Sequence, residues 1–326
     1  MRKKDTEMKI RINEVVTQLK SAKQIALFCH INPDCDTICS ALALRSVLVK
    51  MGKSVDVYCD GELKSELKAI KGAEVINVRT VDSYDTTVAV DCGDMGRVGK
   101  YGALFKRSPV KMCIDHHKQI SSFADITCLD TASGATAELI YLIIQGLDSS
   151  LMDTDIATYL YTALVTDTGN FSFASTGPRT FQIASELMKL GVKNADISYI
   201  FFKEIQMPKF KLKGLAISKT EFFDNDTIGV MYFSQDDLAA CGATSADTSN
   251  LVNEVLNVGS VRVAISITET HPRSYKVSIR TQGEVDASSI AGVFGGGGHH
   301  NAAGFMINGF YGNILDDILK ATRDRI

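Results

Sequence analysis

The sequence of 326 residues has no excess of positive charge, since 35 Lys and Arg residues stand against 38 Asp and Glu residues, a net charge of −3. Proteins that bind long duplex DNA usually have a basic domain, because their affinity depends on many Lys and Arg contacts to phosphate. The charge balance therefore argues against a binder of long duplex DNA. A nucleic-acid substrate would be short and held locally.

Long apolar runs are missing as well. The N-terminal residues MRKKDTEMKIRINEVV are charged and amphipathic and contain no apolar signal core. The longest apolar stretches, such as ELIYLIIQGL, are shorter than the roughly 20 residues that span a bilayer. We therefore expect a cytoplasmic protein that is not associated with a membrane.

The eight cysteines include no CxxC pair, which argues against a structural zinc ribbon. Many of them lie in apolar runs, such as Cys29 in IALFCH and Cys113 in VKMCID. This placement predicts buried free thiols that act as small apolar side chains, in keeping with a reducing cytosol.

The hydrophobic pattern of the first half alternates between strands and helices. After an opening helix at 8–22, it predicts four strands at 24–30, 54–59, 86–91 and 110–115, and helices at 38–51, 133–149, 153–166 and 178–191. This alternation predicts an α/β fold with a parallel sheet. Ligands of such sheets bind outside the carboxyl ends of the strands, where three of the four strands end in His or Asp.

The pattern changes after residue 191. A connecting helix, broken at Pro208, is expected over 192–215, and the following residues are rich in strands, at 219–223, 228–233, 261–269 and 275–282, with one helix at 249–257. The sequence thus predicts a first domain at 1–191, a linker at 192–215 and a second, smaller α/β domain at 216–326. We expect the active site in the cleft between the two domains.

Four separated segments contain side chains that bind metal ions. They are HINPDCD with His30, Asp34 and Asp36, VDCGD with Asp91, the run Asp115-His116-His117, and TDTGN with Asp167. Carboxylates and imidazoles suit manganese, magnesium, iron or zinc. Two metal ions about 3.5–4 Å apart, sharing a carboxylate, can activate water and neutralise a phosphate ester.

Each segment has a plainer interpretation when it is taken alone. Asp34 and Asp36 could be turn residues after Pro33, Asp91 could cap a helix, and His30 could be a core histidine. The four segments together favour a metal site.

These segments resemble, in order, the four motifs of the DHH phosphoesterase family. The C-terminal GGGGHHNAAGF is similar to the signature of that family's DHH-associated domain. Together with TDTGNFSFASTGPRT, it resembles the nanoRNase branch, the bifunctional oligoribonucleases and 3′-phosphoadenosine 5′-phosphate phosphatases. The resemblance extends over roughly residues 10–310.

The resemblance implies two divalent metal ions, Mn²⁺ before Mg²⁺, Fe²⁺ or Co²⁺. The first would be held by His30, Asp34 and Asp91, and the second by Asp36, Asp91, His116 and Asp167, with Asp91 as the bridge. Asp115 would orient a histidine, and His117 would face the scissile phosphate as a hydrogen-bond donor or an acid. Cys35 and Cys39 stand where the family generally has glycine, so that Cys35 is either an additional soft ligand or a side chain that points away.

The glycine-rich segment near the C-terminus is the candidate substrate-binding region. Glycines allow a backbone to approach a ligand closely, and arginine can donate two parallel hydrogen bonds to a phosphate. The candidate residues are Arg280, Gly296, Gly297, Gly298, His299, His300 and Asn301. A flexible linker would be the alternative, but the apolar AGVF and AAGF on either side disfavour it. His300 replaces the Lys or Arg that is usual in the branch.

We therefore expect an enzyme that releases 5′-mononucleotides from short single-stranded RNA, with 3′-phosphoadenosine 5′-phosphate as a second substrate. A linear dinucleotide hydrolase acting on pApA or pGpG, an inorganic pyrophosphatase and a non-catalytic nucleotide-binding regulatory protein are the alternatives. If the linker is a hinge, closure would favour short substrates. The oligomeric state is left open between a monomer and a homodimer.

Overall fold

The computed structural model describes residues 2–118 and 122–326, which form two compact units that divide between Glu204 and Ile205. Each unit has its own sheet and its own hydrophobic core. Within the described ranges, every helix is too short or too polar to cross a membrane. The predicted linker bounds of 192–215 and the predicted cleft between the domains remain predictions.

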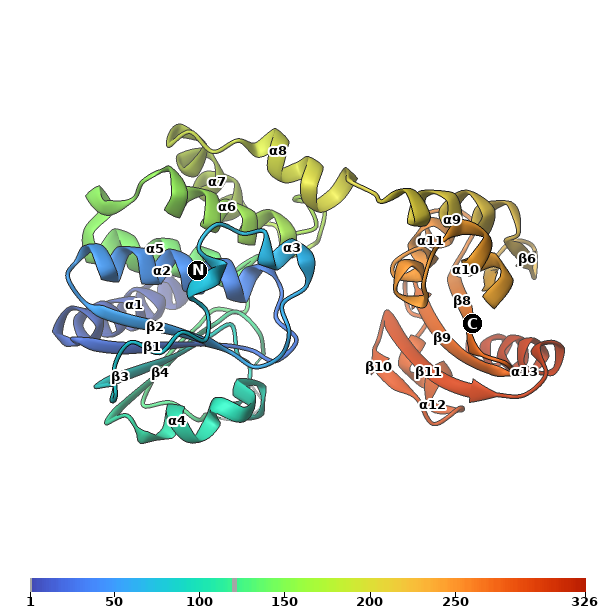
Figure 1. The fold of residues 1–326 in the computed structure, drawn as a ribbon, viewed down its shortest axis with the longest axis horizontal. Helices are drawn as coiled ribbons and strands as arrows, with labels where there is room; N and C mark the ends of the chain where they lie inside the picture. Colours follow the sequence, from blue (N-terminus) through green and yellow to red (C-terminus); the bar gives the residue numbers. More distant parts are fainter. Residues whose placement is uncertain (1, 119–121) are drawn as a thin grey trace. The chain divides into compact units, whose positions relative to one another are not determined.

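The first unit contains a five-stranded parallel sheet, in the order β2-β1-β3-β4-β5 (Figure 1). Its strands are β1 (Gln24–Cys29), β2 (Ser54–Cys59), β3 (Thr86–Val90), β4 (Val110–Asp115) and β5 (Ile126–Leu129). Its helices are α1 (Arg2–Ser21), α2 (Cys35–Lys50), α3 (Ser65–Lys68), α4 (Gly102–Arg107), α5 (Thr136–Asp148), α6 (Thr154–Asp167), α7 (Pro178–Lys189) and α8 (Asn194–Ser198), with a π-helical turn at Tyr199–Lys203. The parallel α/β fold expected from the sequence is confirmed, whereas β5 was not predicted.

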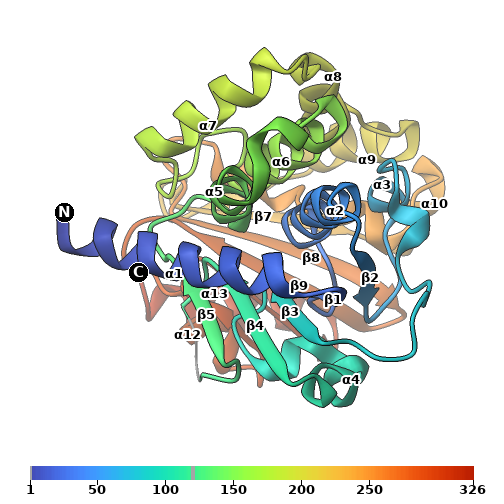
Figure 2. The same ribbon diagram turned by 90° about the vertical axis from the view of Figure 1, so that its left-hand side faces the viewer.

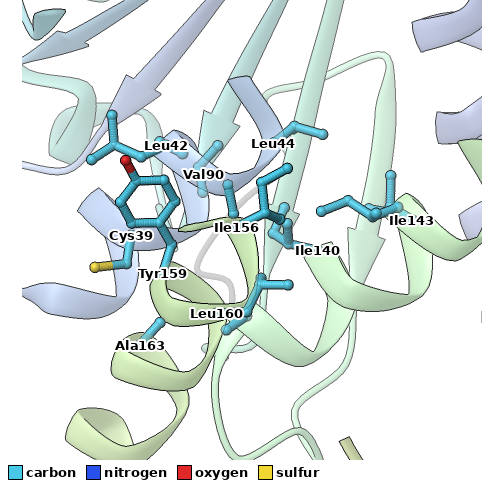
Figure 3. Packing of buried hydrophobic residues seen from close by; sticks show 14 of the residues in the cluster. Cys39, Leu42, Leu44, Val90, Ile140, Ile143, Ile156, Tyr159, Leu160 and Ala163 are labelled. Carbon is cyan, nitrogen blue, oxygen red and sulfur yellow. The ribbon is translucent and has the colours of Figure 1, made fainter. Parts of the chain in front are cut away.

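Most residues of β1, β2, β3 and β4 are buried because both faces of the sheet are covered. Along β1, Ile25 and Leu27 face the core beneath the helices α1, α2, α5 and α6, while Ala26 and Phe28 face a second cluster with Phe105 of α4. Figure 3 shows the first core, where side chains of α2, α5 and α6 interlock. Figure 2 shows α1 lying along α5 and β5. This two-sided burial fixes the strands and leaves their carboxyl ends free for polar residues.

The second unit contains a six-stranded mixed sheet, in the order β10-β11-β9-β8-β7-β6, in which β7 and β8 are parallel. Its strands are β6 (Glu221–Phe223), β7 (Ile228–Phe233), β8 (Val263–His271), β9 (Ser274–Thr281), β10 (Gly297–His299) and β11 (Ala302–Asn308). Its helices are α9 (Met207–Ser218), α10 (Gln235–Cys241), α11 (Val252–Leu256), α12 (Ala287–Gly292) and α13 (Tyr311–Arg323).

One detail of this region agrees with the sequence prediction and one differs from it. The connecting helix is interrupted just before Pro208, since the helical turns end at Lys203 and α9 begins at Met207; Pro208 lies in the first turn of α9, where its missing N–H removes no helical hydrogen bond. The glycine-rich segment was not predicted as a strand, yet it forms the hairpin of β10 and β11. Glycine is depleted in strands because it has no side chain to pack, so local propensity did not indicate this hairpin.

Candidate metal centre

The candidate ligands come from the carboxyl edge of the first unit's sheet and from two helix ends beside it. His30 follows β1, Asp91 follows β3, and His116 follows β4. Three further carboxylates come from helices: Asp34 is the N-cap of α2, Asp36 lies in the first turn of α2, and Asp167 is the last residue of α6. The structure therefore brings together six residues that the sequence spreads over 138 positions, from 30 to 167.

His30, Asp34 and Asp91 form one group whose ligand atoms all lie within 4.8 Å of one another. His30 Nε2 is 3.4 Å from Asp34 Oδ2 and 3.5 Å from Asp91 Oδ2. His30 and Asp91 are almost fully buried, whereas the side chain of Asp34 is 55% exposed. The group thus has an open side.

Asp36, His116 and Asp167 form a second group of the same size. His116 Nε2 is 3.2 Å from Asp167 Oδ2, 3.9 Å from Asp36 Oδ2 and 3.7 Å from Asp91 Oδ1. The two oxygens of Asp91 therefore face different groups, with Oδ2 toward His30 and Oδ1 toward His116. This is the arrangement that a carboxylate needs in order to bridge two metal ions.

Several atoms at the centre of these groups lack hydrogen bonds although they are buried. Among the described residues, His30 Nε2, His116 Nε2 and Asp91 Oδ2 have no hydrogen-bond partner. Buried polar atoms are nearly always paired, because leaving one unpaired costs about 1–3 kcal/mol. Imidazole nitrogens and carboxylate oxygens that converge without hydrogen bonds fit a divalent cation as their common partner.

Backbone carbonyls orient both imidazole rings. His30 Nδ1 pairs with the carbonyl of Ile31 at 2.8 Å, and His116 Nδ1 pairs with the carbonyl of Ser133 at 3.1 Å. Because a carbonyl can only accept, Nδ1 is the donor in each ring. In the neutral ring that metal binding requires, the lone pair would then be on Nε2, the atom that points into the site.

The N-terminus of α5 holds two of the carboxylates, and sequence reasoning missed it. The backbone N–H groups of Thr136 and Ala137 donate to Asp36, at 2.7 and 3.1 Å. The hydroxyl of Thr136 donates to Asp91 Oδ1 at 2.8 Å. Thr136 is fully buried. The segment SGAT before an apolar helix was the available signal, but nothing in it shows which acids it would meet.

The electrostatics of the site show an excess of buried negative charge. Burial, and then repulsion from Asp91 and Asp167, raises the pKa of Asp36. Burial also raises the pKa of Asp167 to about 6, although the charge of His116 acts in the opposite direction. Burial opposes ionisation of His30, but Asp34 and Asp91 outweigh it and raise the pKa of the ring to about 9. A bound divalent cation would supply the positive charge that these carboxylates attract.

His117 differs from His116 in its partners and in its exposure. Asp115 Oδ1 accepts from both the backbone N–H and Nδ1 of His117, each at 3.0 Å, and His117 Nδ1 lies 3.3 Å from Asp91 Oδ1. Hydrogen bonds to Asp115, and then to Asp91, raise the pKa of His117 to about 10. The ring is 48% exposed, and with Asp91 and His116 it forms a third group that could hold an ion. That His117 contacts the scissile phosphate remains a prediction.

Cys35 and Cys39, the cysteines beside the site, are buried free thiols. Burial, and then the neighbouring Asp34, raises the pKa of Cys35 to about 12, so the side chain is a neutral thiol at pH 7. In the part of the chain that the structure describes, the three groups that could hold an ion contain no cysteine.

The structure places the candidate substrate residues around the β10–β11 hairpin of the second unit. Arg280 of β9 pairs with Ala302 of β11, which pairs with His299 of β10, so the three side chains share one face of the sheet. Because Ala302 lies between them, the backbone positions of Arg280 and His299 are roughly 10 Å apart, two strand spacings. Asn301, in the turn, donates through Nδ2 to the carbonyl of Thr281 at 3.2 Å.

Part of the glycine run has a purely structural reason. A Cβ on Gly296 would lie 2.4 Å from the carbonyl oxygen of Gly304, and one on Gly298, whose φ is +152°, would lie 2.4 Å from that of Ala302. A Cβ on Gly297 would meet no atom within 4 Å. Close packing inside the hairpin therefore explains Gly296 and Gly298, whereas Gly297 is open to a ligand. His300 is half exposed and lies 3.9 Å from Asp286.

Two family models match the chain. The model of the DHH family's N-terminal domain matches residues 24–164, which include five of the six candidate ligands. The model of the DHHA1 domain matches residues 230–326, which include the glycine-rich hairpin. Together they cover most of both units.

Full-length relatives agree with these matches. The chain is 29% identical to the bifunctional oligoribonuclease and PAP phosphatase NrnA of Thermus thermophilus, over 91% of this chain and 88% of the relative. It is 24% identical to the protein of the same name from Bacillus subtilis, over 90% and 92%. The crystal structure of an exopolyphosphatase-related protein from Bacteroides fragilis has the same fold, with a TM-score of 0.87, 23% identity, and coverage of 97% and 96%.

Proposed function

Because the chain belongs to the DHH family and carries a DHHA1 domain after its first unit, we propose that it is a two-metal phosphoesterase that hydrolyses short oligoribonucleotides to 5′-mononucleotides. The observation that carries this proposal is the position of Asp91, whose two oxygens face two separate groups of His and Asp side chains. The NrnA relatives support oligoribonucleotides and 3′-phosphoadenosine 5′-phosphate as substrates.

His30, Asp34 and Asp91 would hold one metal ion, and Asp36, Asp91, His116 and Asp167 the other. Mn²⁺ is the proposed ion, since a mixed set of carboxylates and imidazoles suits it. The ions would supply a nucleophile that is active at neutral pH and positive charge for the phosphate oxygens.

The chain's own residues would prepare the reaction around the ions. Ile31 and Ser133 hold the two ligand rings with Nε2 inward, and Thr136 holds Asp36 and Asp91. His117, with Nδ1 bonded to Asp115, has Nε2 available to donate a proton to the leaving oxygen.

The DHHA1 unit would bind the substrate. The guanidinium of Arg280 is suited to a phosphate, and His299 lies on the same face of the sheet. The exposed β10 backbone at Gly297 would add N–H donors. Gly296, Gly298, His300 and Asn301 would shape the hairpin that presents these groups.

The test is a substrate panel with purified protein and Mn²⁺. We expect rapid release of 5′-mononucleotides from RNA dinucleotides and slower cleavage of a 24-mer. Equal rates on the two lengths would contradict the preference for short substrates. Turnover restricted to pApA and pGpG would assign the chain to cyclic-dinucleotide breakdown, and tight nucleotide binding without turnover would assign it a regulatory role.

A pair of variants tests the metal centre itself. Asp91→Asn should lower turnover by at least about 100-fold, because an amide is a weak ligand and cannot bridge two cations. Asp155→Asn, at an exposed carboxylate that pairs with Lys71 in the same unit, should leave turnover unchanged. Turnover of Asp91→Asn close to that of the wild type would overturn the assignment.

A further inference from the structure

Arg179 lies in the first turn of α7. Among the described residues, its hydrogen bonds and ion pairs include none to the candidate ligands. Its guanidinium instead gathers three groups. Nε donates to Glu138 Oε2 at 2.6 Å, and Nη2 donates to Asp130 Oδ2 and to the hydroxyl of Ser133, each at 2.6 Å. Arg179 therefore connects α7 with both ends of the segment 130–138.

The two carboxylates that pair with Arg179 also hold the backbone of this segment. Asp130 accepts from the N–H of Ala132 at 3.1 Å and from the hydroxyl of Ser133 at 3.1 Å. Glu138 is 1% exposed, and its Oε1 accepts from the N–H of Gly134 at 3.1 Å and from Thr180. The loop between β5 and α5 is thus held at Ala132, Ser133 and Gly134 by acids that Arg179 pairs.

This loop and the first residue of α5, which follows it directly, contact three of the candidate ligands. The carbonyl of Ser133 orients His116, while Thr136 donates to Asp36 and Asp91. A shift of this loop would move the donors and acceptors of all three side chains together. Groups that orient metal ligands commonly change metal affinity by 10–100-fold when they are removed.

We propose that Arg179 is a positioning residue for the metal centre, acting through the segment 130–136 on His116, Asp36 and Asp91. The inference rests on the proposed function, since it assumes that these residues hold metal ions. A buried ion pair is weak evidence for stability, because the cost of desolvation offsets the attraction. The contribution of Arg179 is geometric, because its rigid, planar guanidinium donates to three acceptors at once. The ammonium group of a lysine cannot reproduce this arrangement of donors.

The surroundings of Arg179 make the substitution practicable. The side chain is 35% exposed and lines a cavity of about 1110 Å³, together with residues of α1, β5 and α5. A methionine at this position would meet open space rather than a packed core. Removal of the Arg179 charge leaves the buried carboxylate of Glu138 without its cationic partner. The double variant Arg179→Met/Glu138→Gln, which removes both charges, is therefore required beside the single one.

The experiment measures Mn²⁺ binding by isothermal titration calorimetry without substrate, with circular dichroism to verify folding. We expect Arg179→Met and the double variant to bind Mn²⁺ roughly 10–100-fold more weakly than the wild type. The Mn²⁺ affinity of Arg179→Lys should lie between that of these variants and that of the wild type. Lys189→Met, an exposed substitution on the same helix whose lysine pairs with Glu186, should bind Mn²⁺ like the wild type.

Steady-state kinetics supply the second measurement. If Arg179 positions the ligands, the Mn²⁺ concentration for half-maximal activity rises in the variants, while KM for an RNA dinucleotide at saturating Mn²⁺ stays unchanged. A folded double variant with the Mn²⁺ affinity of the wild type would refute the inference and leave the proposed function intact. Tight Mn²⁺ binding by the wild type without hydrolysis of any nucleotide would refute the function alone. A wild type that binds no Mn²⁺ would refute both.

Discussion

Thr136→Val isolates one hydrogen bond in the candidate metal centre. Valine has nearly the same shape as threonine, so the fully buried site keeps its packing. The backbone N–H of residue 136 still donates to Asp36, and only the hydroxyl donor to Asp91 Oδ1, 2.8 Å away, is removed. Any change in metal binding then reports on how firmly Asp91 is held between the two groups.

The magnitude follows from the ionised acceptor. Hydrogen bonds to charged groups contribute about 1.5–3 kcal/mol, and about 1.4 kcal/mol corresponds to a factor of ten in affinity. If the orientation of Asp91 depends on this bond, Mn²⁺ affinity should fall roughly 10- to 150-fold. This range overlaps the loss that is usual for groups that orient metal ligands.

Isothermal titration with Mn²⁺ measures the effect, and Thr322→Val is the matched control. Thr322 is also fully buried, but its hydroxyl donates to the carbonyl of Ile318 within α13 of the second unit. The control should bind Mn²⁺ like the wild type. A Thr136→Val protein that is folded and binds Mn²⁺ within threefold of the wild type would refute the reasoning, because Asp91 would then be oriented without Thr136.

Two further predictions concern other parts of the chain. Gly298→Ala should lower the stability of the second unit by about 1–3 kcal/mol, since the added Cβ would lie 2.4 Å from the carbonyl oxygen of Ala302. Gly297→Ala is the control, because its Cβ would meet open space. Equal thermal stability of the two variants would contradict this prediction. Tyr84→Phe removes a 2.6 Å hydrogen bond to the buried Asp56, whose pKa is lowered because hydrogen bonds from Thr80 and Tyr84 outweigh the effect of burial. The stabilisation is therefore fully present above the unfolded pKa of about 3.9 and is lost as the pH falls through the lower folded pKa. The unfolding free energies of the wild type and Tyr84→Phe, measured by urea titration, should differ by about 1.5–3 kcal/mol at pH 7 and approach each other below pH ~4. A difference in unfolding free energy that stays constant down to pH 3 would contradict the prediction.

The first unit was easier to predict than the second. Strands such as β1 and β4 are short apolar runs between polar residues, because both of their faces are buried, and this pattern is visible in the sequence. β5 has four residues, three of them only partly buried, and gives no such signal. β10 consists of two glycines and His299, and its pairing depends on close contact with Ala302 and Gly304 of β11 rather than on its own propensity.

The sequence by itself determined that acids and histidines would meet, because the carboxyl ends of parallel strands lie along one edge of a sheet. It did not determine which atoms would face each other. Only the tertiary structure turned the two oxygens of Asp91 toward different groups and brought Thr136, 45 positions further along the chain, within hydrogen-bond distance of one of them. In the sequence, Arg179 is 63 positions from His116, one of the ligands that it would position through Ser133. Such contacts depend on how α5 and α7 pack beside the sheet, which no local pattern encodes.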